Sequence, residues 1–187
     1  MDRSRADNAG PTAVAAAKTD RSRRVLVVAV GNPFRHDDGL GLAVLDRLVA
    51  LAQADDSLAH ADIVEESGEP VALISRWADY DSVIMIDAVS SGGQPGQLHR
   101  IECSGGNWDL GRSSARASTH GLGVAEAVAL GRTLDRLPHR LVVLGLETAD
   151  VSQGEGLSAP VAASLEQLID AAVADIRSES ALPVQVS

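Results

Sequence analysis

Cysteine and aromatic residues are nearly absent from this chain of 187 residues. Cys103 is the only cysteine, and aromatic side chains make up 2% of the sequence. A single cysteine excludes an intrachain disulfide, and we expect a cytoplasmic protein. With so few aromatic side chains, the core must be built from Val, Leu, Ile and Ala. That composition is typical of a parallel sheet with helices packed on both faces.

Long apolar runs and positive charge are also scarce. No run approaches the ~20 apolar residues needed to cross a bilayer, and residues 13–17 are too short for the core of a signal peptide. The net charge is −10; residues 1–24 hold six Lys or Arg against three Asp, which leaves −13 on the remainder. Such an acidic body repels nucleic acids and anionic membranes. We therefore expect a protein partner with a basic or cationic face.

Several catalytic motifs are missing as well. The sequence contains no H-E-x-x-H segment and no recognisable Ser–His–Asp or Cys–His arrangement, so it does not resemble an ordinary protease. The loop after the first predicted strand lacks G-x-G-x-x-G. It contains Asp37 and Asp38 instead, which would repel a pyrophosphate at the start of a helix. These features disfavour a dinucleotide-binding dehydrogenase.

Three apolar runs predict strands that are buried on both faces of a sheet: Val25–Val30, Ser82–Val89 and residues 141–146. Shorter strands are predicted at residues 61–65 and, at a sheet edge, at residues 97–102. Apolar spacing and capping residues predict helices between these strands, starting after residue 39, at Pro70, near residue 118 and near residue 158. The helix near residue 118 is expected to continue to about Leu137, where Pro138 ends it, with Leu134 on its buried side.

The alternation of strands and helices predicts a three-layer α/β fold. Its centre would be a twisted, mostly parallel sheet of about five strands with helices on both faces. We expect one domain over residues 23–177, with a flexible N-terminal tail at residues 1–22 and a C-terminal tail at residues 178–187.

Four polar residues are expected near the carboxyl edge of this sheet, where ligands bind in such folds. Asp37 and Asp38 follow the first strand, Asp87 lies near the end of the strand Ser82–Val89, and His120 begins a helix. One acid of the adjacent pair could simply cap a helix. A carboxylate inside an apolar strand is costly unless it is paired, so Asp87 points to function. Two carboxylates and an imidazole would suit a divalent transition ion with open coordination positions.

Three segments together resemble the hydrogenase maturation protease family. Residues 31–41, G-N-P-F-R-H-D-D-G-L-G, are similar to its signature G-N-x-x-x-x-D-[DE]-G-x-G. Ile86-Asp87-Ala88 resembles the strand-borne Asp of the family, and residues 118–123 resemble its S-x-H-x-x-G segment. The order and spacing match from about Val25 to Ile169.

The resemblance implies a cytosolic endopeptidase that removes a C-terminal extension from the large-subunit precursor of nickel–iron hydrogenase. Nickel already bound in the precursor would be the recognition mark. Asp38, Asp87 and His120 would bind that nickel and form the catalytic site, which other divalent ions could also occupy. The family has the same kind of fold, a twisted sheet covered by helices. The metal would position the precursor first, and could also act as a Lewis acid.

Some alternatives remain open at this stage. The same three residues would serve a non-cleaving chaperone that binds metal or hydrogenase, and a nucleoside hydrolase would need a further cluster of acids. Residues 65–70 depart from the Gly-Gly-Thr turn of several relatives, which leaves open the hydrogenase class that is processed. His36 could add a metal ligand, but in a short polar loop we expect it to be solvated. We expect His99 at the surface.

Overall fold

A computed structural model describes residues 24–103 and 121–180. His120, and with it one third of the predicted nickel site, lies outside the described residues. The strands are β1 (Val25–Val30), β2 (Ala61–Glu66), β3 (Ser82–Val89), β4 (Leu98–Glu102) and β5 (Arg140–Glu147). The α-helices are α1 (Leu40–Ala54), α2 (Pro70–Trp77), α3 (Gly121–Thr133) and α4 (Ala159–Ser180), and short 3-10 turns span His36–Gly39 and Asp56–Leu58.

The strands form one sheet in the order β2-β1-β3-β5-β4. β1 pairs in parallel with β2 and β3, and β3 pairs in parallel with β5. β4 is an antiparallel edge strand beside β5. The three predicted apolar strands therefore form the centre of the sheet, which confirms the fold class predicted from the sequence.

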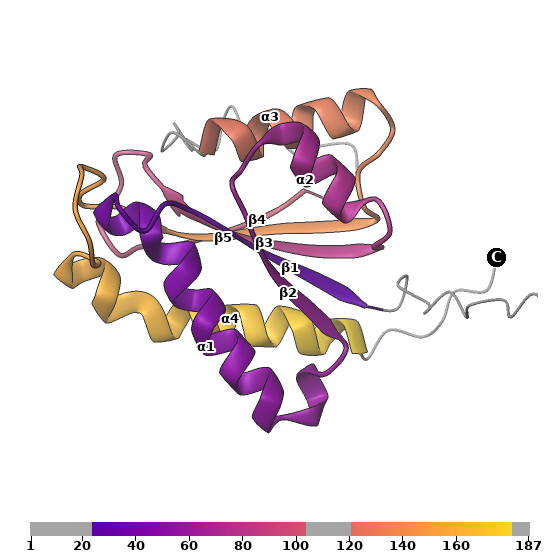
Figure 1. The fold of residues 1–187 in the computed structure, drawn as a ribbon, viewed down its shortest axis with the longest axis horizontal. Coiled ribbons are helices and arrows are strands. Elements are labelled where there is room, and N and C mark those ends of the chain that lie inside the picture. Colours follow the sequence, from indigo (N-terminus) through magenta and orange to yellow (C-terminus); the bar gives the residue numbers. More distant parts are fainter. Residues whose placement is uncertain (1–23, 104–120, 181–187) are drawn as a thin grey trace, which may run out of the picture.

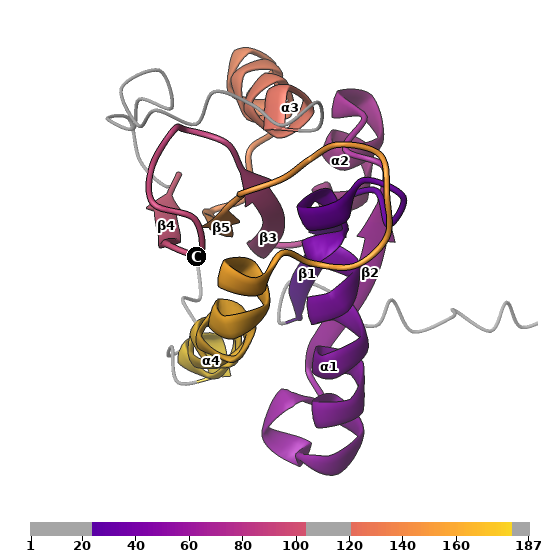
Figure 2. The same cartoon turned by 90° about the vertical axis from the view of Figure 1, so that its left-hand side faces the viewer.

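Helices cover both faces of this sheet, with α1 and α4 on one side and α2 and α3 on the other (Figures 1 and 2). Alternate residues of the central strands divide between two apolar clusters, because successive side chains of a strand point to opposite faces. Ile84 of β3 packs with α1 and α4, whereas Met85 packs with α2 and α3. Trp77 of α2 is buried in the second cluster, and its indole N–H donates to the carbonyl of Arg136 at 2.8 Å. Both predicted helical layers are present.

The prediction for the end of α3 was wrong. The helix ends at Thr133 instead of continuing to Leu137, and Leu134 is 52% exposed instead of buried. Asp135 has a left-handed backbone with φ +52, and the N–H of Arg136 donates to the carbonyl of Gly131 at 2.7 Å. This arrangement closes a helix end as a Schellman motif does, although glycine usually occupies the left-handed position. The helix therefore stops before Pro138 can act on it.

The last helix extends beyond the predicted end of the domain. α4 continues to Ser180 and so includes the first residues of the segment that we expected to be a C-terminal tail. Within residues 24–103 and 121–180, no helix is both long and apolar enough to cross a membrane.

Candidate active site

The turn that bears Asp38 and the strand that bears Asp87 lie at the same edge of the sheet. β1 and β3 are parallel neighbours, and the 3-10 turn His36–Gly39 after β1 packs against β3. The carboxyl ends of both strands therefore bring together two acids that are 49 positions apart in the sequence. Asp38 is 1% exposed and Asp87 is 3% exposed. Buried carboxyl groups close to one another are unusual unless they bind something.

Asp87 is held in an environment that disfavours its charge. The pKa of its carboxyl group is raised to about 8. Burial is the main cause and the negative charge of Asp38 adds to it, whereas the hydrogen bond from the N–H of Ala88 to Oδ1, at 2.8 Å, lowers the pKa. The influence of Asp38 on this pKa reflects the proximity of the two carboxyl groups. A strongly perturbed carboxyl group at the ligand-binding edge of a sheet is a mark of a functional site.

Asp38 is positioned by a tight loop of its own backbone. Its N–H donates to the carbonyl of Arg35 at 3.0 Å, and its carbonyl accepts from the N–H of Asn32 at 3.0 Å. The loop closes this tightly because Gly31 has no side chain: a Cβ there would overlap the carbonyl oxygen of Asp38. The first glycine of the signature is therefore required by the position of the site acid.

Gly31→Ala is expected to destabilise the protein by about 2 kcal/mol or more, because the added methyl group must displace the carbonyl of Asp38. The same displacement moves the Asp38 carboxyl group and should reduce peptide cleavage. Urea unfolding and a cleavage assay measure the two effects. A variant as stable and as active as the wild type would show that the loop tolerates a Cβ at this position.

Asp37, next to Asp38, has a structural role instead. Its Oδ2 accepts from the N–H groups of Ala149 and Asp150 at 2.8 and 2.9 Å and from the hydroxyl of Ser158 at 2.9 Å. Its Oδ1 accepts from the N–H of Ser158 at 2.7 Å, immediately before α4. Asp37 is fully buried. Neither acid of the pair caps the helix that follows it, contrary to what the sequence suggested. Asp37 instead accepts from the residue before α4, more than 100 positions away.

The start of α3 is relevant to His120, because His120 is the residue before this helix in the sequence. The first turn of α3 packs against the end of β2, where a Cβ on Gly123 would overlap the carbonyl oxygen of Gly68. α3 thus begins at the carboxyl edge of the parallel strands, the edge that also bears Asp38 and Asp87. Within residues 24–103 and 121–180, no group of three His, Cys, Asp or Glu side chains is arranged to hold a metal ion.

His36 turns away from the two acids. Its Nδ1 lies 3.2 Å from the carbonyl oxygen of Gly156, and its Nε2 lies 4.0 Å from Oδ2 of Asp150. The side chain is about one-third exposed. His36 is therefore partly solvated, as expected for this loop, and it also contacts the segment between β5 and α4.

Glu147 is a buried acid that the sequence analysis missed. It ends β5 and is 1% exposed. The N–H groups of Ser91, Gly92 and Gly93 and the hydroxyl of Ser91 donate to its carboxylate, and His99 Nε2 lies 2.9 Å from Oε2. Burial alone would raise the pKa of Glu147, but the hydrogen bonds from Ser91 and its neighbours outweigh it and lower the pKa. His99 is thus a partner of this acid and not merely a surface residue.

The fold and this edge define the protein as a three-layer α/β protein in which Asp38 and Asp87 are buried together at the ligand-binding edge of the sheet. The sequence profile of the family described as hydrogenase maturation protease matches residues 48–175. The chain belongs to the hydrogenase maturation protease family and is an endopeptidase of hydrogenase maturation. This confirms the family predicted from the three motifs, and it favours cleavage over the non-cleaving chaperone.

Individual relatives agree with this assignment. The hydrogenase expression/formation protein HupD of Rhizobium leguminosarum bv. viciae is 25% identical over 156 residues, which are 83% of this chain and 75% of HupD. The hydrogenase 2 maturation protease of Escherichia coli strain K12 is 24% identical over 155 residues, 82% of this chain and 91% of that protein.

Solved structures show the same fold. The hydrogenase maturating endopeptidase HybD of Escherichia coli matches with a TM-score of 0.67 and 22% identity, over 83% of this chain and 93% of HybD. The [NiFe] hydrogenase maturation protease HybD of Thermococcus kodakarensis matches with a TM-score of 0.60 and 22% identity, over 80% of this chain and 96% of that one.

Proposed function

We propose that this endopeptidase acts in the cytoplasm on the large-subunit precursor of a nickel–iron hydrogenase and removes its C-terminal extension after nickel has been inserted. Asp38, Asp87 and His120 bind the nickel carried by the precursor. The observation that carries this proposal is the pair of buried, mutually repelling carboxyl groups, Asp38 and Asp87, at the ligand-binding edge.

A cation bound between these two groups removes the repulsion and compensates the burial of their charge. The pKa of Asp87 is raised to about 8, so a nearby cation would favour the charged form of its carboxyl group. Two carboxylate oxygens and one imidazole nitrogen are ligands suited to a divalent transition ion. They leave further coordination positions for ligands supplied by the precursor, which distinguishes this arrangement from a closed structural zinc site.

His120 is assigned from the family motif, and the position of α3 supports the assignment. The helix starts at the edge that bears the two acids. In this proposal the three side chains bind and orient the precursor, and the ion that they share with it can polarise the scissile carbonyl. Positioning is the primary role because the nickel arrives with the substrate.

The test is incubation of the purified protein with nickel-loaded and nickel-free precursor, followed by measurement of intact mass. We expect the loaded precursor to lose a C-terminal peptide and the nickel-free precursor to keep its mass. His120→Ala should release no peptide, because the nickel then loses one of its three protein ligands. His139→Ala is the matched control, since His139 is an exposed histidine just before β5, and it should cleave as the wild type does.

Each other outcome has a definite meaning. Equal cleavage of both precursors would show that nickel is not the recognition mark. Stable binding of the loaded precursor without loss of mass would instead support the non-cleaving chaperone. Normal cleavage by His120→Ala would remove this residue from the proposed site.

A further inference from the structure

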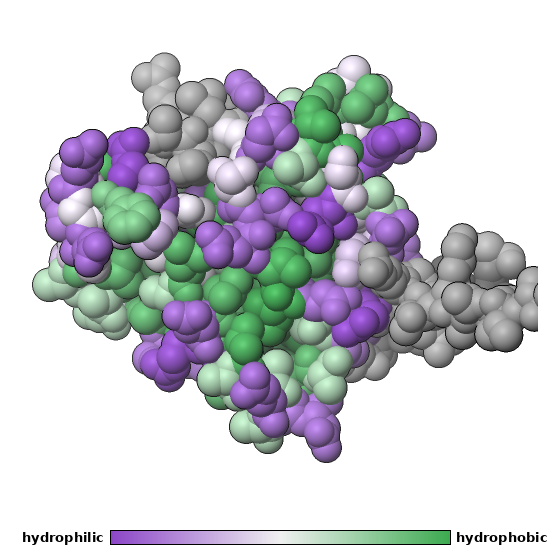
Figure 3. Space-filling view, in the orientation of Figure 1, coloured by the Kyte–Doolittle hydropathy of each residue, from purple (hydrophilic) through white to green (hydrophobic). Residues whose placement is uncertain are grey.

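Two loops next to Asp38 form a rigid platform at one corner of the protein. We call residues 32–36 and 151–156 the recognition platform. The first loop joins β1 to the turn that bears Asp38, and the second lies between β5 and α4 (Figure 1). In the space-filling view this corner is mainly polar and carries an isolated apolar spot (Figure 3).

Hydrogen bonds fix the two loops to each other. The N–H of Gly154 donates to the carbonyl of Phe34 at 2.9 Å, and the N–H of His36 donates to the carbonyl of Gly154 at 2.8 Å. The guanidinium of Arg35 donates twice to the carbonyl of Val151, at 3.2 and 3.0 Å. The Asp37 carboxylate holds the residues on either side of the second loop, Ala149 and Ser158. A surface held in this way loses little conformational freedom when a partner binds.

The platform presents the most exposed of the large apolar side chains in the described residues. Phe34, the only phenylalanine of the chain, is 66% exposed. The N–H of Phe34 donates to Oδ1 of Asn32 at 3.0 Å, which fixes the turn below the ring. An aromatic ring on a rigid loop has few conformations to lose and a large apolar area to bury. Such residues are the usual anchors of protein interfaces.

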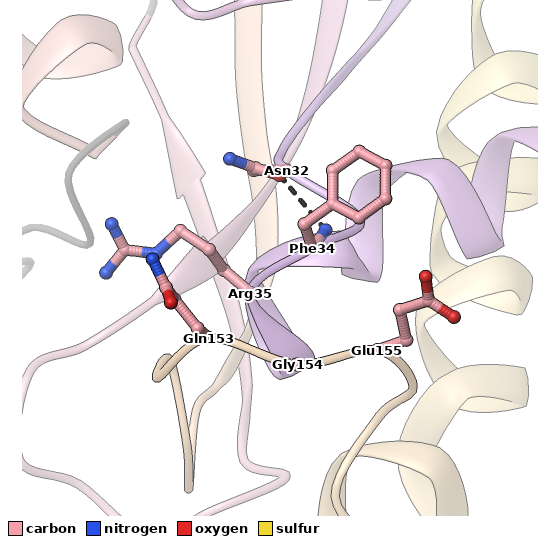
Figure 4. Close-up of a pocket in the computed structure, with 6 residues that line it drawn as sticks. All are labelled: Asn32, Phe34, Arg35, Gln153, Gly154 and Glu155. Carbon is pink, nitrogen blue, oxygen red and sulfur yellow. Dashed lines mark hydrogen bonds between the residues drawn. The ribbon is translucent and has the colours of Figure 1, made fainter.

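Phe34 borders a shallow pocket of about 540 Å³ lined by Asn32, Phe34, Arg35, Gln153, Gly154 and Glu155. Figure 4 shows the ring of Phe34 and the carboxylate of Glu155 on one side of this pocket, with Arg35 and Gln153 on the other. The pocket is continuous with the active-site loop, because Arg35 and Asn32 form the backbone hydrogen bonds that hold Asp38. A chain bound here would lie beside whatever is bound at Asp38.

We propose that the recognition platform binds the polypeptide segment of the precursor that lies next to its nickel centre, with Phe34 packing against an apolar side chain of that segment. This inference rests on the proposed function, which identifies the precursor as the substrate. The acidic character of the chain and the exposed Glu155 favour a segment that also contains a basic residue, placed on the side of the pocket away from Arg35. Nickel would then mark a precursor as ready for cleavage, and the platform would recognise its polypeptide.

The experiment measures binding and cleavage separately. Binding of the full chain to nickel-free precursor reports on the platform alone, since that precursor is not cleaved and offers no metal to Asp38, Asp87 and His120. Phe34→Ala should weaken this binding about tenfold and raise the KM for nickel-loaded precursor to a similar extent, with kcat nearly unchanged. Phe34→Trp should restore both values, because it keeps an aromatic surface.

Leu134→Ala is the matched control. Leu134 is also an exposed apolar residue, at 52%, but it follows α3, at the opposite edge of the sheet. Both alanine variants should keep the thermal midpoint of the wild type within about 2 °C, because each removes an exposed side chain. The inference would be overturned if Phe34→Ala bound nickel-free precursor as tightly as the wild type does. It would also be overturned if the wild type did not bind nickel-free precursor at all. Absence of peptide release from nickel-loaded precursor would overturn the proposed function instead.

Discussion

Asp87→Asn is expected to abolish cleavage of the precursor and, at the same time, to make the free enzyme more stable. Loss of one of the proposed nickel ligands should reduce cleavage by roughly 10²-fold or more, since even residues that only support metal ligands contribute 10–100-fold. The gain in stability follows from burial, which raises the pKa of the Asp87 carboxyl group to about 8. An amide at this position carries no charge that would have to be buried.

The gain in stability of Asp87→Asn over the wild type should increase with pH. In the folded chain Asp87 keeps its proton up to about pH 8, whereas the unfolded chain loses it near the ordinary value of 3.8. The folded state therefore binds more protons between these values, and raising the pH through this window lowers the free energy of unfolding of the wild type. The advantage of Asp87→Asn should grow from pH 4 to pH 8 by at most about 1.4 kcal/mol per pH unit. Urea unfolding at pH 5 and pH 8 measures it.

Asp175→Asn is the matched control for this experiment. Asp175 is also a buried acid, but Arg100 and Arg140 donate to its carboxylate. Burial alone would raise the pKa of Asp175, yet these two arginines hold it below its ordinary value. The control should therefore lose stability, by roughly 3 kcal/mol, and keep its cleavage activity. Unchanged cleavage by Asp87→Asn, or a loss of stability at pH 8, would contradict the role assigned to Asp87.

Asp37→Asn is expected to lose stability, unlike Asp87→Asn, and to lose cleavage activity as well. Four groups donate to the Asp37 carboxylate, and an amide can present only one oxygen to them. At least one buried donor would then face the NH₂ group, so we expect a loss of about 3 kcal/mol or more. Cleavage should fall as well, because the loop before α4 is part of the recognition platform. Urea unfolding and the KM for nickel-loaded precursor measure the two losses.

Ser158→Ala is the control for Asp37→Asn, because it removes only one of the four hydrogen bonds to the Asp37 carboxylate. It removes only the hydroxyl that donates to Asp37 and leaves the backbone N–H of residue 158 in place. The free energy of unfolding of Ser158→Ala should fall by about 1 kcal/mol, the usual contribution of one hydrogen bond. If Asp37→Asn were no less stable than Ser158→Ala, the carboxylate would not be what holds the loop.

The fold could be predicted largely from the sequence because its central strands are continuous apolar runs. β1 and β3 read directly as strands buried on both faces, and their position between helices fixed the layers. The end of α3 could not be read in the same way. It depends on the left-handed backbone of Asp135, a conformation that asparagine and aspartate adopt only in some contexts. Pro138, the helix breaker that can be seen in the sequence, lies after the point at which α3 has already ended.

The site was only partly predictable. Asp87 could be predicted as a candidate because a carboxylate inside an apolar strand is costly unless it is paired. The division of roles between Asp37 and Asp38 could not be predicted, since the partners of Asp37 lie 112 to 121 positions away. Glu147 was missed, although it too directly follows an apolar run. Its donors are in the turn after β3 and on β4, and only the folded chain brings them to it.

The different environments of the two adjacent acids predict how well each position would tolerate a longer side chain. The family signature admits Asp or Glu at the position of Asp38 but only Asp at the position of Asp37. The Asp37 carboxylate fits into a ring of four donors that the backbone fixes, so an extra methylene would carry it past them. In the proposed site an ion could shift to meet a longer side chain at position 38, whereas α4 and its preceding loop cannot shift in the same way. A lineage that acquired Glu at position 37 would have to remodel residues 149–158 with it.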